Sequence, residues 1–221
     1  MRWGPLIGVL ATAGLGGCTS VYSRQPLFAL ADVADAPTLR TGIWVLGDPG
    51  GPCRPRPRAP ISHWKGCEGW LLVRGQDIVT PDDEGGWTST AHLIVSGAPP
   101  VWQLGPEEEE GGPRYVYFGL KPLARDAQDR VTRLEAWNAL CGPPGAEVAK
   151  PDRPGARAAP KPDPATMLPG LVLGETGWDC RASDQAAVRR AVAYGAEHPE
   201  WRMSFDLNWV REARADDFAR R

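Results

Sequence analysis

Short apolar runs separated by turn residues dominate the pattern of this chain. Runs of four to six apolar, β-branched or aromatic residues lie between clusters of Gly, Pro and Asp, which is typical of short strands. These runs predict strands at residues 42–46, 70–74, 91–95, 101–104, 115–120 and 130–140. Residues 203–211 alternate between apolar and polar, which predicts a half-buried strand. The pattern therefore favours an antiparallel meander sheet.

One segment in the C-terminal half has a helical period. Ser183 or Asp184 can cap a helix there, and Pro199 ends it. The apolar positions fall at i, i+3, i+4 and i+7, at Val188, Ala191, Val192 and Gly195. We therefore expect an α+β, mostly β fold in which one helix packs on the sheet.

The segments around the predicted domain have no regular period. Residues 18–40 are predicted to be a lipidated N-terminus and tether, and residues 212–221 a frayed, charged tail. Between them, residues 41–211 form a single β-rich domain. Within this domain, residues 142–169 hold eight prolines and predict a flexible loop.

Composition narrows the class of protein. The chain has 221 residues, 42% hydrophobic and 24% charged, with a formal net charge of −2. This balance excludes a fully disordered chain and a wholly basic surface of the kind that binds nucleic acid. The 26 glycines and 23 prolines predict many turns.

The N-terminus has the features of an export signal. The short basic start, Met1–Trp3, precedes an uncharged apolar stretch over residues 6–15. That stretch is too short to span a bilayer but fits the apolar region of a secretory signal. A plain secretory peptide cleaved near Ala13 or Gly17 is the simpler alternative.

The four residues Leu15-Gly16-Gly17-Cys18 add a more specific signal, because they resemble the lipobox of bacterial lipoproteins. The resemblance covers residues 1–20 and implies that residues 1–17 are removed and that Cys18 carries the acyl chains. It implies a lipid-anchored protein, with Thr19 after the cysteine favouring the periplasmic face of the outer membrane over the inner membrane. The Arg-rich, Ala-rich composition is similar to that of periplasmic lipoproteins from GC-rich Gram-negative bacteria.

Four cysteines remain once Cys18 is assigned to lipid. They lack C-x-x-C spacing, which argues against a zinc ribbon or a thioredoxin-like motif. An oxidising compartment favours disulfides, and four cysteines permit three connectivities. We favour the sequential one, which staples the two most proline-rich stretches: Cys53 with Cys67, and Cys141 with Cys180.

Candidate ligand contacts lie in predicted loops. Arg54, Arg56 and Arg58 alternate with prolines, which favours a polyproline II rim carrying three guanidinium groups suited to carboxylate or phosphate. A solvated basic loop is the alternative. Exposed rings in loops can stack on sugar or peptide, and the candidates are Trp64, Trp87 and Trp178.

Acidic clusters give weaker signals. Residues 82–84, with Asp77 nearby, can offer oxygens to Ca²⁺, but their spacing matches no calcium loop and favours a plain turn. The run Glu107–Glu110 predicts a solvated loop tip. We therefore expect no metal and no cofactor.

Catalytic signals are sparse. The sequence has three histidines, His63, His92 and His198, and His198 suits a helix C-terminus. No catalytic nucleophile, zinc or nucleotide-binding motif is present. We therefore expect a membrane-anchored periplasmic module that binds or supports the cell envelope without catalysis. Its expected partners are the bilayer, through the anchor, and peptidoglycan, lipid headgroups or an envelope protein. We expect no nucleic-acid partner. The alternative is a periplasmic hydrolase or metal-dependent enzyme that uses His63 and His92.

Overall fold

The computed structural model describes residues 20–47, 53–64, 67, 69–81, 87–109, 111–148 and 160–218. The predicted signal peptide, Cys18 and residues 82–84 lie outside them. Within the described residues no helix is both long and apolar enough to cross a membrane.

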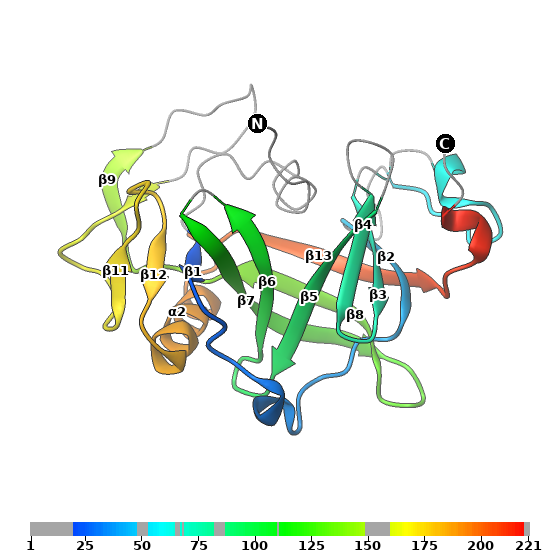
Figure 1. Ribbon diagram of the computed structural model, residues 1–221, viewed down its shortest axis with the longest axis horizontal. Helices are drawn as coiled ribbons and strands as arrows, with labels where there is room; N and C mark the ends of the chain where they lie inside the picture. Colours follow the sequence, from blue (N-terminus) through cyan, green and yellow to red (C-terminus); the bar gives the residue numbers. More distant parts are fainter. Residues whose placement is uncertain are drawn as a thin grey trace.

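Eight strands form the body of the molecule (Figure 1). They are β2 (Gly42–Leu46), β3 (Trp70–Arg74), β4 (Asp77–Pro81), β5 (Trp87–Val95), β6 (Val101–Glu109), β7 (Gly112–Arg125), β8 (Val131–Asn138) and β13 (Ser204–Arg211).

The strands β2 to β8 follow one another as an antiparallel meander, as the sequence predicts. The late strand β13 then pairs with β8 on one side and with β2 on the other, also antiparallel. The sheet therefore closes into a barrel, which goes beyond the expected meander. Strand β4 was not predicted, because its short apolar run sits directly against turn residues.

The interior of the barrel is filled by side chains. Trp44 from β2 and Trp102 from β6 are fully buried there, with Leu134 from β8 and Leu207 from β13 at 1% exposure each. Eight strands enclose a space just wide enough for side chains to fill. The interior is therefore a packed core.

The residues that follow Ser20 belong to the domain, so the prediction of a tether over 18–40 is wrong for residues 20–40. Strand β1 (Val21–Ser23) is buried and pairs with β7 and with β12 (Cys180–Ala182). A 3-10 helix, η1 (Leu30–Val33), follows. Leu39 then packs against the barrel core, and the Trp44 indole donates to the Arg40 carbonyl at 2.9 Å.

The predicted helix is present as α2 (Gln185–Glu197) and packs on the outside of the barrel. The Asp184 carboxylate caps it by accepting from the Ala187 amide at 2.8 Å. Its buried face meets Trp137 of β8, whose indole donates to the Val192 carbonyl at 3.1 Å. The expected fold class, with one helix on an antiparallel sheet, is therefore confirmed.

The proline-rich stretch 142–169 was expected to be a flexible loop, but its described residues include paired strands. Strands β9 (Pro144–Val148) and β10 (Pro160–Pro162) form a separate two-stranded sheet. Strand β11 (Leu171–Leu173) pairs with β12. The disulfide Cys141–Cys180, here called the buried disulfide because its cysteines are 1% and 0% exposed, joins this region as predicted.

The start of the predicted frayed tail is also ordered. After β13, residues 212–214 lead into a 3-10 helix, η3 (Ala215–Phe218), which contains the buried Asp217. This helix lies beside another 3-10 helix, η2 (Ile61–His63), at one end of the molecule (Figure 1).

Candidate binding surface

A disulfide-closed loop covers the outer face of β2, β3 and β4. Its closing bond, Cys53–Cys67, here called the loop disulfide, is the other predicted pair. Ile61 and Trp64 of the loop are 3% and 7% exposed and pack on outward-facing residues of the three strands, among them Ile43, Leu72 and Val79. The barrel wall is therefore a rigid base for the loop.

Residues 56–59 of this loop form a turn, so the extended polyproline II rim expected over the arginines does not continue through Arg58. The Ala59 amide donates to the Arg56 carbonyl at 2.8 Å, which closes a four-residue turn with Pro57 at its second position. Proline favours that position because its φ is already set. The Trp64 indole N–H lies beneath and is shared between the Arg56 carbonyl at 3.0 Å and the Ala59 carbonyl at 3.2 Å.

A buried ion pair from the C-terminal segment holds the other side of the turn. Arg211, at the end of β13, donates to Asp217 of η3 at 2.7 Å, and their side chains are 8% and 0% exposed. The Asp217 carboxylate also accepts from the Arg214 amide at 2.8 Å. Burial opposes ionisation of Asp217, but these hydrogen bonds outweigh it and lower the pKa of the carboxyl below its usual value.

The ion pair connects the C-terminal segment to the turn through its carbonyl groups. Arg211 donates to the Ala59 carbonyl at 3.4 Å, and Arg214 donates to the Arg58 carbonyl at 3.2 Å. The guanidinium of Arg211 also lies 5.5 Å from the Trp64 ring centroid. Two segments far apart in the sequence therefore fix one turn.

Four exposed arginines lie in and beside this turn, and we call them the arginine surface: Arg54, Arg56, Arg58 and Arg214. Arg54 contacts the Cys53 carbonyl at 3.3 Å. Arg56 and Arg58 form no ion pair with any side chain in the described part of the chain. The nearby Glu212 is 4.0 Å from Arg40. Guanidinium groups of this kind suit carboxylate or phosphate oxygens.

Two of the other candidate contacts take part in the fold. Trp64 supports the turn from below. Trp87 lies in β5 with its ring 5.3 Å from that of Trp70. Trp178 is half-buried, and the Lys161 ammonium lies 5.6 Å from its ring centroid. Trp64 and Trp87 therefore belong to one hydrophobic cluster under the loop, whereas Trp178 lies apart from it.

The histidines do not converge on a site. His92 points into the barrel, where Nδ1 accepts from the Trp102 indole at 3.1 Å and Nε2 lies 3.0 Å from the Gly75 carbonyl. Burial lowers the pKa of His92, which favours the neutral ring. His63 is exposed in η2, and His198 follows α2, stacked on Trp201 at 4.3 Å.

The described part of the acidic run is strand and not the solvated loop tip expected from its charge; Glu110 lies outside the described residues. Glu107–Glu109 continue β6, paired with residues 112–114 of β7. Burial, with the charge of Glu109 adding to it, raises the pKa of Glu107 to about 7. Asp77, the expected neighbour of a calcium turn, starts β4. Among the described residues no group of three His, Cys, Asp or Glu is placed to hold a metal.

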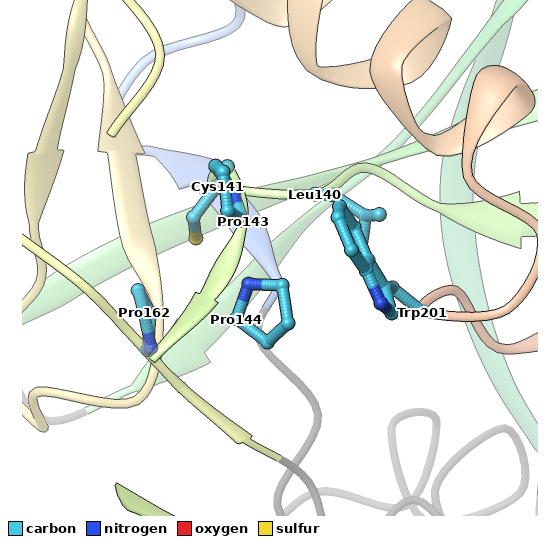
Figure 2. A pocket seen from close by; sticks show the side chains of 7 residues that line it. Leu140, Cys141, Pro143, Pro144, Pro162 and Trp201 are labelled. Carbon is cyan, nitrogen blue, oxygen red and sulfur yellow. The ribbon is translucent and has the colours of Figure 1, made fainter. Parts of the chain in front are cut away.

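The two best-formed hollows of the described residues are not lined by the arginines of the arginine surface. The first is enclosed by Leu140 and Trp201 on one side and by prolines 143, 144 and 162 on the other, and its volume is only about 10 Å³ (Figure 2). That volume is near the least needed for one water molecule. The second, of about 260 Å³, lies between the segment 26–30 and the outer face of β5 and β6. It is open and mostly apolar, and its Gln103 amide already bonds to Phe28.

Comparison of the chain with protein-family models, with curated proteins and with solved structures finds no match.

Proposed function

We propose that this chain is a lipid-anchored periplasmic module that binds an anionic component of the cell envelope without catalysis. The observation that carries the proposal is the arginine surface, which a disulfide, an indole and a buried ion pair hold on a rigid barrel. A packed barrel core supports binding at the surface over binding inside.

The anchor in this proposal is the acylated Cys18, and the favoured location is the periplasmic face of the outer membrane. The support is the order of a basic start, an apolar stretch and the lipobox at residues 15–18. Two or three acyl chains hold a protein stably on a bilayer. Because Ser20 directly precedes β1, the anchor would hold the barrel close to the lipid.

Two measurements test the proposal. Labelled palmitate should enter the wild-type chain in a Gram-negative host and should not enter Cys18→Ala; labelling of both variants, or of neither, contradicts the anchor. Pull-down of the wild-type chain from envelope fractions should enrich an anionic component, and Arg56→Gln/Arg58→Gln should reduce the yield. Equal yields from both chains would remove the arginine surface from the proposal.

A further inference from the structure

The shape of the arginine surface, and not only its charge, limits the kinds of ligand that it can bind. The surface is a turn on the outside of the barrel wall, and neither of the two hollows described above lies beside it. Trp64, the ring nearest the turn, is buried beneath it and donates to its carbonyls. A glycan strand binds best in a groove or on an exposed ring; the two hollows lie elsewhere, and the Trp64 ring is covered by the turn.

A flat array of phosphates fits this surface better. Projecting guanidinium groups can each meet a separate phosphate, because lipids in a bilayer rearrange laterally. Arg211 is paired with Asp217, so the positive charge that this surface can offer comes from its exposed arginines, foremost Arg56 and Arg58. Each basic residue near an anionic bilayer strengthens attachment by about fivefold.

We infer that the arginine surface docks on the phosphate headgroups of the bilayer that carries the anchor. The inference rests on the proposed function, because the anchor brings that bilayer near. Only Thr19 separates Cys18 from Ser20, and two residue steps span at most about 7 Å. Phospholipid phosphate is then the anion at the highest local concentration.

The two contacts fall at different ends of the molecule. Strand β1, next to the anchor, lies toward one end of the long axis, while η2 and η3 beside the arginine turn lie toward the other (Figure 1). A bilayer contact at both places holds the barrel lengthwise along the membrane. A weak electrostatic contact suffices for this, because the anchor makes the second contact intramolecular.

The test measures how strongly the full chain prefers anionic vesicles, without the acyl chains. The full chain carrying Cys18→Ser is mixed with vesicles of pure phosphatidylcholine or of phosphatidylcholine with phosphatidylglycerol, and the ratio of its two partition coefficients is determined by sedimentation. Attachment through the apolar N-terminal stretch is common to every variant and cancels in comparisons between them. The ratio should fall toward one in 0.5 M salt, where charges are strongly screened.

Charge reversals at two places distinguish a specific contact through the arginine surface from a general effect of the protein's net charge. Arg56→Glu/Arg58→Glu should lower the ratio by about 20-fold or more at low salt, from about fivefold for each arginine. The matched control, Arg74→Glu/Arg125→Glu, makes the same change at two exposed arginines of barrel strands β3 and β7, away from the turn and from β1, and should lower it far less.

Three outcomes overturn the inference. The chain shows no preference for phosphatidylglycerol, the two double variants lower the ratio equally, or the chain sediments with purified peptidoglycan through Arg56 and Arg58 while ignoring the vesicles. Palmitate labelling of the wild-type chain is independent of all three. A failed anchor and a failed headgroup contact are therefore distinguished.

Discussion

The buried pair Arg211–Asp217 makes the sharpest prediction about stability. In Asp217→Asn the side chain keeps its shape but loses its charge, and its new N–H groups face the donors of Arg211. The carboxylate accepts from the Arg211 guanidinium and from the Arg214 backbone amide, and the side chains of Arg211 and Asp217 are 8% and 0% exposed. Removing one member of a buried pair leaves an uncompensated charge, which costs about 3–5 kcal/mol.

Urea unfolding followed by circular dichroism measures this loss at pH 7. The matched control is Asp129→Asn, which removes an ion pair to Arg125 in which Asp129 is 85% exposed. An exposed pair of this kind contributes about 0–1 kcal/mol. If both variants lose less than about 1 kcal/mol of unfolding free energy, the Arg211–Asp217 pair does not stabilise this region and the prediction is refuted.

The same variant carries a pH signature. A carboxyl whose pKa is lowered on folding stabilises the native state above its ordinary pKa, and that contribution is lost as the pH falls through the lowered value. The wild type should therefore lose stability in strong acid more steeply than Asp217→Asn. Hydrogen exchange at residues 54–59 should also accelerate in the variant, because the turn loses its second support.

The remaining predictions concern the two disulfides, a glutamate and a glycine. Limited dithiothreitol on the native protein, followed by alkylation and peptide mapping, should open the half-exposed loop disulfide first and spare the buried disulfide, because the attacking thiolate needs access; simultaneous opening would contradict this. Glu107→Gln should stabilise the protein by about 1–2 kcal/mol at pH 8 and hardly at all at pH 4. The reason is that ionisation of Glu107 opposes folding as the pH rises toward about 7. If the variant and the wild type differ in urea midpoint by the same amount at both pH values, this prediction is refuted. Gly119→Ala should lower the free energy of unfolding by about 1–3 kcal/mol, since the added Cβ would lie 2.3 Å from the Trp137 side chain. In the control Gly69→Ala, the added Cβ meets only the Leu46 side chain, at 3.2 Å. The same urea titration should show a smaller loss of unfolding free energy for the control.

Local pattern was sufficient for the elements whose signals are local. The helix after Ser183 was predicted because its cap, its apolar stripe and Pro199 lie within one short segment. The strand at 203–211 was predicted because alternation is a property of consecutive residues. Its partners were not predictable, because the pairing of Leu207 with Leu46 and with Leu134 joins segments that are far apart in the sequence.

Composition misled the prediction where tertiary contacts outweigh it. Four successive glutamates predict a solvated tip, yet three of them extend β6 because the facing strand carries Arg114, which pairs with Glu109 at 3.1 Å. Prolines predict an extended rim at 54–58, yet the Trp64 indole stabilises a turn. In both places the deciding partner lies outside the run.

In the arginine surface too, the local features could be predicted from the sequence and the long-range contacts could not. The three loop arginines and the loop disulfide could be proposed from sequence, because both are local features of residues 53–67. The fourth arginine, Arg214, could not, because it reaches the turn only through the closing strand β13 and the buried Asp217. Closure of the barrel therefore completes the surface: the strand that seals the core also delivers the segment that fixes the turn. A variant that weakens the pairing of β13 with β2 and β8 should consequently destabilise the turn that carries the arginines, although it leaves their charges unchanged.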